Sequence, residues 1–308
     1  MPSVLFAHMH PRDFDFFTVM FNSIGWKVYI PSDKEPNYFG YGLTIKPSRG
    51  EATPLTYAEV LDIKPDVVLC LCYEQLSESR KLSQKIGAKF VVRTGNNNIP
   101  YNKQHSDFLI SNDTYTYINC DIPNKLFFYM PPDYGFYCKQ PWYNDSRLVT
   151  SYIHFYDRYW KDSWSIYNNI KRNNKDFVFI NFGVNDNPID NLNITEPADI
   201  VRTLGISRGL LHVKEQEGYG WSLLEAISCG IPVIAFKPYV VGKTCEHFLI
   251  EGITAILINN SNEFRNAILD VDTLSTISEK GHKFIREFIN EEEQYSKIKT
   301  FFEEVVLA

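Results

Sequence analysis

The sequence lacks a long apolar run. None of its stretches holds the ~18 consecutive apolar residues from which a membrane-spanning helix is recognised. The first residues, MPSVLFAHMHPRDFDF, also lack the basic start and the longer apolar stretch of a secretory signal. We therefore expect a cytoplasmic protein.

Paired cysteines and basic stripes are absent too. The six cysteines form no Cys-x-x-Cys pair, so their spacing matches no zinc pattern. The net charge is -6, and residues 1–140 hold 14 basic and 14 acidic side chains, whereas residues 141–308 hold 17 and 23. Without a basic stripe to neutralise phosphates, stable binding to nucleic acid is not expected.

The first half of the chain contains apolar runs that alternate with helical patterns. The stretch between Pro31 and Pro54 is rich in Pro, Gly, Tyr and Ser and predicts an irregular excursion. The predicted strands are residues 4–7, 26–30, 66–72, 89–93 and 107–111. The predicted helices are residues 14–23, 57–61 and 74–86.

The second half restarts the same rhythm after the polar stretch Cys138–Ser146. Strands are predicted at 148–153, 177–181, 209–213, 232–236 and 254–258, and helices at 161–172, 223–228 and from 262 to the end. Strands that alternate with helices predict parallel sheets. We expect an α/β fold of two Rossmann-like domains, residues 1–140 and 141–308, facing a central cleft, with a last helix able to cross back.

One segment suits a phosphate ligand. It starts at Glu217, and Gly218 and Gly220 bracket a single aromatic residue before a helix begins. Glycines let the backbone approach a ligand closely. The free N–H groups and the positive end of the helix dipole attract a phosphate. In parallel sheets such loops lie at the carboxyl ends of the strands, where ligands bind.

Two carboxylates flank this loop. Glu217 precedes it, and Glu225 lies in the following helix. A carboxylate accepts hydrogen bonds from a sugar or ribose diol, and each such bond contributes about 1.5–3 kcal/mol. A nucleotide-sugar, two sugars joined by a diphosphate, fits this layout. From spacing alone, the alternative is a solvated helix residue at 225 and a favourable helix-start charge at 217.

The segment resembles the signature of retaining GT-B glycosyltransferases, especially glycosyltransferase family 4. That pattern is a Glu, seven residues, a second Glu, and then small-x-Gly-x-Pro-Val. The matching residues are Glu217, Gly218, Gly220, Glu225, Ala226, Gly230, Pro232 and Val233. Downstream, Glu246 and the pair Glu251-Gly252 resemble the family's "Pro-Glu…Asp-Gly" region. The similarity is specific over residues 209–258, fair over 148–308 and only architectural over 1–140.

The resemblance implies roles for the donor side. Glu217 would contact the hydroxyls of the transferred sugar, and Glu225 the ribose of the nucleotide. The backbone at Gly218, Tyr219 and Gly220 would hold the diphosphate. Tyr219 stands where the family usually has Phe.

The family also has an Arg/Lys pair that neutralises the leaving diphosphate. Arg158 and Lys161 are the candidates here, although their spacing is short and the glycine that normally precedes the Arg is missing. Two surface cations at a helix start are the alternative. Lys214, which stands where the family often has Ser, and Gly183, which follows the strand 177–181, complete the donor-side candidates.

The acceptor side matches the family less well. Members often carry a histidine after the fourth strand, but the corresponding residues here are Thr94, Gly95, Asn96 and Asn97. Asn96 and Asn97 are therefore only candidate acceptor-side residues, and no acceptor-side base is identified.

Two histidines and two acidic pairs complete the candidate residues. His8 and His10 end the first strand and are expected to line the cleft, with capping or core positions as the alternative. The acidic pairs, DFD at 13–15 and DVD at 270–272, match the DxD metal motif of the other glycosyltransferase fold. DFD opens a helix, where acids are common, and DVD lies in a helical tail, so we treat both matches as chance and predict no metal.

The combined prediction is a hexosyltransferase-like enzyme. It would move a sugar from a UDP- or GDP-sugar to a hydroxyl of an unidentified glycan, lipid or small molecule, with retention and without a metal or other cofactor. Three alternatives remain open: a catalytically inactive nucleotide-sugar-binding partner subunit, and an epimerase or a phosphorylase on the same scaffold. An inverting DNA-base glucosyltransferase is disfavoured by the neutral first half.

Overall fold

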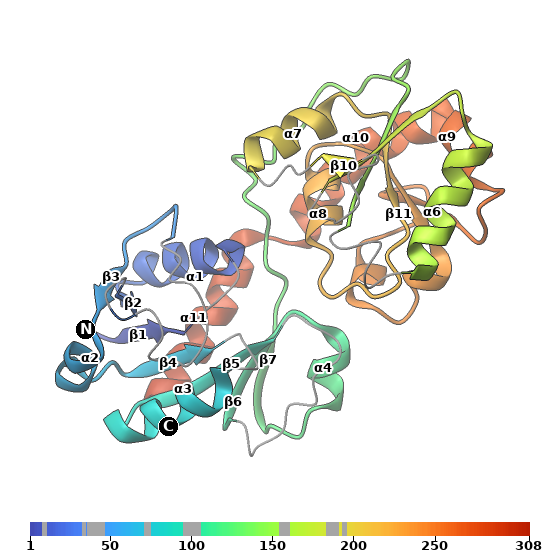
Figure 1. Ribbon diagram of the computed structural model, residues 1–308. Helices are drawn as coiled ribbons and strands as arrows, with labels where there is room; N and C mark the ends of the chain where they lie inside the picture. Colours follow the sequence, from blue (N-terminus) through green and yellow to red (C-terminus); the bar gives the residue numbers. More distant parts are fainter. Residues whose placement is uncertain are drawn as a thin grey trace. The chain divides into compact units, whose positions relative to one another are not determined.

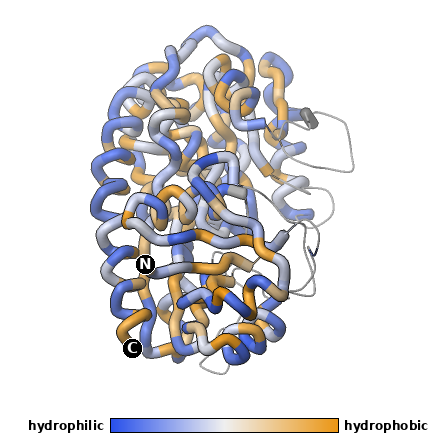
Figure 2. Tube along the Cα trace, turned by 90° about the vertical axis from the view of Figure 1, so that its left-hand side faces the viewer, coloured by the Kyte–Doolittle hydropathy of each residue, from blue (hydrophilic) through white to orange (hydrophobic). Residues whose placement is uncertain are grey.

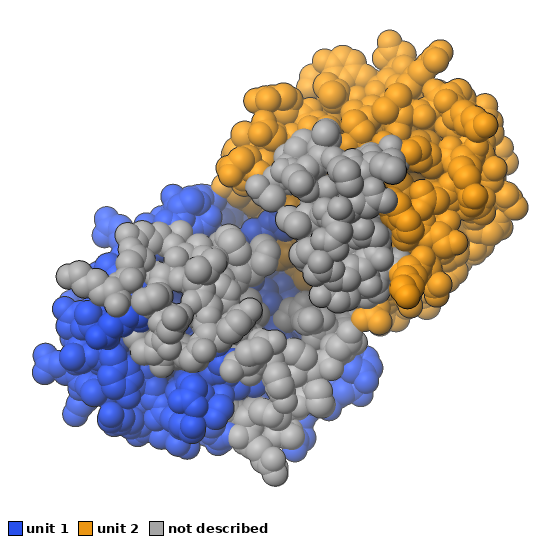
Figure 3. Space-filling model, viewed as in Figure 1, with its two compact units in different colours: residues 1–130, 291–308 blue, residues 131–290 orange. Residues whose placement is uncertain are grey.

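The computed structural model describes two compact units, coloured separately in Figure 3. Unit 1 comprises Met1–Met130 and Glu291–Ala308, and unit 2 comprises Pro131–Asn290. The described residues are 1–7, 11–32, 35, 47–70, 75–94, 106–153, 161–182, 191–192 and 196–308.

The division between the units lies earlier than the polar stretch at which we placed it. Residues 131–140 belong to unit 2 because they pack against its helices. The amide of Gln140 donates to the carbonyl of Cys229 at 2.9 Å. Lys139 forms an ion pair with Glu279. A polar composition therefore marks an exposed surface here and not a linker.

Unit 1 contains a parallel seven-stranded sheet in the order β3-β2-β1-β4-β5-β6-β7. Its strands are β1 (Ser3–Phe6), β2 (Lys27–Pro31), β3 (Thr53–Leu55), β4 (Val67–Cys70), β5 (Lys89–Thr94), β6 (Phe108–Ser111) and β7 (Asn124–Phe127). Strand order reverses at β1 and β4, as in a doubly wound fold.

Helices cover both faces of this sheet (Figure 1). Successive strand residues point to opposite faces. Leu5 packs in the core cluster with residues of α2 and α3, whereas Phe6 contacts Phe14 and Phe21 of α1 at ring-centroid distances of 5.8 Å. The helices are α1 (Pro11–Ser23), α2 (Tyr57–Ile63), α3 (Leu76–Ile86), α4 (Thr114–Asn119) and α11 (Glu291–Leu307).

The last helix, α11, belongs to the core of unit 1. The ring of Phe302 lies 4.8 Å from that of Phe21 and 6.0 Å from that of Trp26. Tyr295 packs against Phe16 at 5.5 Å. Through these ring contacts, α11 packs against residues from the beginning of the chain. This is the crossing-back that the sequence analysis had left open.

Unit 2 contains a parallel six-stranded sheet in the order β10-β9-β8-β11-β12-β13. Its strands are β8 (Leu148–Tyr152), β9 (Val178–Phe182), β10 (Asn191–Leu192), β11 (Gly209–His212), β12 (Val233–Phe236) and β13 (Ala255–Ile258). Strand order reverses between the neighbours β8 and β11.

Helices again lie on both sides of the sheet. The core cluster of one face combines Tyr167 of α6 and Phe264 of α9 with Leu211 of β11. Figure 1 shows α8 on the other side of the sheet, beside α10. The helices are α6 (Lys161–Asn173), α7 (Pro197–Gly205), α8 (Trp221–Ser228), α9 (Phe264–Leu269) and α10 (Val271–Phe288), with 3₁₀ turns η2 (Lys237–Tyr239) and η3 (Thr244–His247).

The sequence pattern missed the shorter elements. Strand β3 lies at the end of the stretch predicted to be irregular, and α4, β7, α7 and β10 were not predicted. Helix α4 has the sequence TYTYIN, which lacks an apolar period, and begins instead because the Asp113 side chain caps the amides of Tyr115 and Thr116. Hydrophobic and hydrophilic residues alternate along the helices in Figure 2, which is the pattern that did predict the longer ones.

The helices contain no membrane span. Within the described parts of the chain, none of them is both long enough and apolar enough to cross a bilayer.

Shortening Phe302 tests the contribution of α11 to unit 1. The buried ring contacts the aromatic cluster, so Phe302→Ala should destabilise unit 1 by about 3–5 kcal/mol. Hydrogen exchange of the β1 amides should accelerate accordingly. The exposed neighbour Glu303 provides the control, because Glu303→Ala should change stability by less than about 0.5 kcal/mol. Unchanged β1 protection in Phe302→Ala would refute this role of α11.

Candidate functional site

The candidate site lies where strand order reverses in unit 2, between β8 and β11. In parallel sheets, ligands bind beyond the carboxyl ends of the strands at such a switch point. The loop that follows β11 is joined there to the start of α6, the helix that follows β8. The Ser163 hydroxyl accepts a hydrogen bond from the Glu215 amide at 2.8 Å. The two loops are therefore fixed next to each other.

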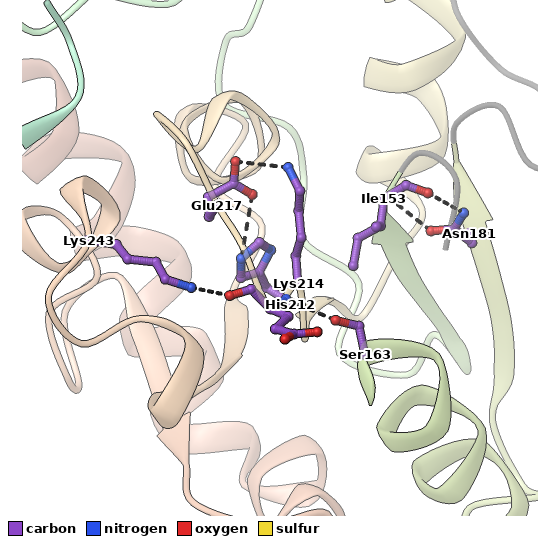
Figure 4. A network of polar contacts seen from close by, with 8 residues as sticks. Ile153, Ser163, Asn181, His212, Lys214, Glu217 and Lys243 are labelled. Atoms are coloured by element: carbon purple, nitrogen blue, oxygen red, sulfur yellow. Dashed lines mark hydrogen bonds and ion pairs between the residues drawn. The ribbon is translucent and has the colours of Figure 1, made fainter. Parts of the chain in front are cut away.

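On this loop, Glu217 lies between the side chains of Lys214 and of His212, the last residue of β11 (Figure 4). Its Oε1 lies 3.2 Å from Nζ of Lys214, and its Oε2 lies 3.6 Å from Nε2 of His212. Glu217 is only 6% exposed. A buried carboxylate is costly to desolvate unless it is paired. The paired geometry therefore keeps a polar acceptor at the carboxyl end of β11.

The electrostatics keep Glu217 ionised. Burial alone raises the pKa of its carboxyl group, but the charge and hydrogen bond of Lys214 and the charge of Lys243 counteract burial, as does His212 when it is protonated, so the pKa is lowered. For His212, burial is the largest influence and lowers the pKa to about 4 despite the nearby Glu217. At neutral pH the imidazole is therefore uncharged, and Lys214 supplies the countercharge that contacts Glu217.

A second lysine approaches the same loop from η3. Nζ of Lys243 donates a hydrogen bond to the carbonyl of Glu215 (Figure 4). Burial lowers the pKa of Lys243, although nearby Cys245, Glu217 and Glu215 counteract this effect. The loop is thus contacted by Ser163 at the start of α6 and by Lys243 before η3, and Lys214 pairs with Glu217 within it.

Gly220 shapes the start of α8. It has φ +92°, the left-handed conformation that favours glycine, and serves as the N-cap residue without a side-chain cap. Its carbonyl accepts hydrogen bonds from the amides of Leu223 and Leu224, both at 3.1 Å. A helix N-terminus without a side-chain cap carries a partial positive charge and attracts an anion.

Glu225 is buried in α8. It is 1% exposed and stands in the otherwise mostly apolar sequence WSLLEAIS. The predicted alternative of a solvated helix residue is therefore wrong. Its carboxylate also affects Cys229, whose thiol pKa is raised to about 12, mainly by burial and secondly by Glu225. Fully buried glutamates are rare in proteins, so Glu225 is a candidate for a role beyond packing.

Tyr219 contributes its backbone to the loop. Its ring is buried and packs edge-on against Trp221 at 5.3 Å and against Phe248 at 6.4 Å. The side chain is therefore committed to packing, and only the main chain of the segment Gly218–Gly220 is suited to hold a phosphate.

The other predicted residues are placed less fully. Lys161 begins α6 as an exposed residue, two positions before Ser163, and so lies at the same end of the sheet as Glu217. Six candidates lie outside the described residues, and their assignments stay predictions: Arg158, Gly183, His8, His10, Asn96 and Asn97.

The DFD acids of unit 1 have structural partners. Asp15 accepts hydrogen bonds from the amide and hydroxyl of Ser48 at 2.6 and 2.5 Å. Asp13 forms a buried ion pair with Arg93 at 2.5 Å. These contacts explain both acids within the fold. The prediction that no metal is needed stays a prediction.

Sequence reasoning missed two residues of the site. His212 is the last residue of an apolar strand, and a polar residue at that position is a usable sign of a site at the strand's carboxyl end. Lys243 lies on an irregular loop before η3, and only tertiary packing brings it to the loop after β11.

Comparison with known proteins places the fold. No family model and no curated protein matches the sequence. Among solved structures, HepE from Anabaena in complex with UDP-glucose matches with a TM-score of 0.72 and 12% identity, over 98% of this chain and 99% of HepE. Sucrose-phosphate synthase from Thermosynechococcus elongatus matches with a TM-score of 0.70 and 11% identity, over 99% and 98%.

A glycosyltransferase from Rickettsia africae is also similar, with a TM-score of 0.67 and 13% identity over 99% of this chain and 98% of that one. Identities this low establish the fold and nothing further. The chain has the α/β architecture of GT-B glycosyltransferases, with two parallel-sheet domains, as the sequence analysis predicted.

Gly220→Ala tests the shape of the loop, with Gly242→Ala as the matched control. Both glycines have positive φ, +92° and +76°, so both substitutions incur backbone strain of about 1–2 kcal/mol. A methyl group at Gly220 would also lie 3.0 Å from Phe248, whereas one at Gly242 meets nothing within 4 Å. Gly220→Ala should therefore lower the free energy of unfolding by about 1–3 kcal/mol more than Gly242→Ala in denaturant titrations. Equal effects would refute the predicted close packing at Gly220.

The lowered pKa of His212 predicts a pH dependence of stability. The folded pKa of about 4 lies below the ordinary value of 6.5, so the unfolded chain binds the proton more readily. This contribution is fully present above about pH 6.5 and falls by roughly 3 kcal/mol as the pH approaches 4. The unfolding free energy of His212→Gln should lose less over this window than that of the wild type. The pKa of His282 is also lowered, mainly by burial, but this affects both proteins equally. Parallel curves for the two proteins would therefore contradict the lowered pKa of His212.

Proposed function

We propose that this protein is a glycosyltransferase that moves a sugar from a nucleoside-diphosphate sugar to an acceptor hydroxyl. One observation carries the proposal. A buried, ionised carboxylate, Glu217, stands directly before the glycine-rich start of α8, at the switch point of a parallel sheet. An acceptor of hydroxyl hydrogen bonds beside an anion-binding helix end matches the two chemical parts of such a donor.

Glu217 binds the hydroxyl groups of the transferred sugar. Because its pKa is lowered, it is an ionised acceptor at neutral pH. Lys214 donates a hydrogen bond to one oxygen of the carboxylate and so orients it, while the His212 ring faces the other oxygen at 3.6 Å. A carboxylate has about four lone-pair sites and only accepts hydrogen bonds, which suits it to the hydroxyl groups of a sugar.

The diphosphate and the ribose are assigned to the neighbouring groups. The main chain of Gly218–Gly220 and the dipole of α8 suit the diphosphate. Glu225, buried in the same helix, is assigned to the ribose, in keeping with the family 4 resemblance of the segment. HepE is described with UDP-glucose, which makes UDP-glucose the first donor to test.

The reaction breaks the bond between the anomeric carbon and the diphosphate oxygen, and the electron pair leaves with the diphosphate. The acceptor oxygen forms the new bond to the anomeric carbon, and its proton passes to the departing phosphate or to solvent. Preorganised dipoles and cations stabilise the developing charge. Helix α8 supplies the dipole, and Lys161 is assigned as a cation with Arg158. Retention of configuration and independence of metal complete the proposal, in keeping with the same resemblance.

A catalytically inactive partner subunit is the competing function. The short spacing of Arg158 and Lys161 motivates it. Such a protein would bind the donor in the same place without consuming it, so turnover separates the two functions where binding does not.

Glu217→Gln is the experiment that tests the function. Gln keeps the size of the side chain but removes the charge that strengthens its hydrogen bonds to the sugar. Loss of two charge-assisted bonds of about 1.5–3 kcal/mol each should lower kcat/KM by about 100-fold or more. UDP or GDP release from a panel of nucleotide-sugars, with and without candidate acceptors, gives the rates.

Glu215→Gln is the matched control. It removes a carboxylate two residues away and keeps the backbone of Glu215, which makes the hydrogen bonds to Ser163 and Lys243. This variant should keep turnover within about 3-fold of the wild type, since these hydrogen bonds remain and the charge of the partly exposed Glu215 side chain is screened. Equal rates for Glu217→Gln and the wild type would exclude the sugar-binding role. Wild-type protein that binds a donor without releasing nucleotide would favour the inactive subunit.

A further inference from the structure

Lys243 is a charged residue that neither the sequence motif nor the fold comparison assigns. It is the N-cap residue of η3 and is only partly exposed. Its Nζ reaches the carbonyl of Glu215, two residues before Glu217 on the loop that follows β11 (Figure 4). An ammonium group with three donors is thereby held at the loop by one backbone acceptor.

The segment after Lys243 packs directly on the start of α8. A methyl group placed on Gly220 would lie 3.4 Å from Cβ of Cys245 and 3.0 Å from the Phe248 ring. Both of these residues are completely buried. Lys243 therefore begins a segment that packs on the end of α8 without a side-chain cap, and its own ammonium group donates to the carbonyl of the loop before that helix.

Lys243 forms no ion pair with any residue in the described parts of the chain. Lys214, by contrast, is paired with Glu217 at 3.2 Å. The carboxylate of Glu246, three residues after Lys243, accepts the amide of Gly242 at 2.6 Å and so serves the local turn. A partly buried ammonium without a carboxylate partner is expensive to desolvate, which favours an anionic ligand as its partner.

From this packing we infer that Lys243 binds the diphosphate of the nucleotide-sugar, together with the start of α8. The inference rests on the proposed function and adds to it a catalytic residue that touches the leaving group. The charge on the diphosphate oxygens grows as the bond to the anomeric carbon breaks, and a fixed cation stabilises it at that moment. Lys214 is paired with Glu217. The two lysines therefore have different roles: Lys214 pairs with the carboxylate, and Lys243 binds the diphosphate.

The test compares nucleotides that differ only in their phosphates. Binding of uridine, UMP and UDP to the full-length protein is measured by calorimetry for the wild type, Lys243→Met and Lys243→Arg. Lys243→Met keeps the length of the side chain and removes the charge. It should weaken UDP binding by about 10-fold or more and leave uridine binding within about 2-fold, because a lysine binds phosphate as a point charge. Lys243→Arg should restore most of the UDP affinity.

Lys237→Met is the matched control. Lys237 is an exposed lysine on η2, in the same connection between β12 and η3. Its removal changes the net charge equally but should leave UDP affinity within about 2-fold, since an exposed distant charge is screened. Thermal unfolding of each variant verifies that the fold is retained.

The outcomes separate this inference from the function on which it rests. If Lys243→Met binds UDP as the wild type does, or weakens uridine, UMP and UDP by the same factor, Lys243 does not bind the diphosphate and the inference is overturned alone. If the wild type binds neither UDP nor GDP, and binds neither UDP-sugars nor GDP-sugars, the proposed function is wrong. The inference about Lys243 is then wrong as well.

Discussion

The chemistry of unit 2 depends on a buried carboxylate that stays charged. Glu217 lies at the carboxyl end of a parallel sheet, where burial alone would favour its neutral form. Lys214 contacts one oxygen, and the uncharged imidazole of His212 faces the other. The low pKa of His212 matters here because a charged imidazole would compete with a ligand for the carboxylate. With one charged and one neutral neighbour, Glu217 stays ionised and contacts only one positive charge.

The surrounding fold gives this carboxylate its setting. The order of strands reverses between β8 and β11, so the loops that follow these strands diverge to opposite faces of the sheet and leave their first residues side by side. The Ser163–Glu215 hydrogen bond fixes that arrangement. Gly220 then turns the chain into α8 with its N-terminus uncapped by a side chain. Acidic, basic and dipolar groups therefore lie close together in the loop between β11 and α8, next to the start of α6.

The sequence predicted the fold class and the acidic residues but not the full environment of Glu217. Long strands and helices carry a periodic apolar pattern, and the Glu217–Val233 segment carries a recognisable spacing, so both were found. Short elements such as α4 depend on a cap, and the edge strand β7 is only partly buried, so neither has a strong period. Lys243 was missed because it reaches Glu215 through tertiary packing, which leaves no local pattern. The polar stretch taken for a linker packs through Lys139 and Gln140 onto unit 2.

The route of the chain also dictates an order of assembly during synthesis. Helix α11 supplies Tyr295, Phe301 and Phe302 to an aromatic cluster whose other members lie within the first 130 residues. Unit 2 is continuous in sequence and precedes α11, so all of its residues leave the ribosome before α11, which completes unit 1. The domain translated first is therefore the one completed last, and until then it exposes the apolar surface that α11 will cover. A chaperone that acts on nascent chains would encounter that surface throughout the synthesis of unit 2.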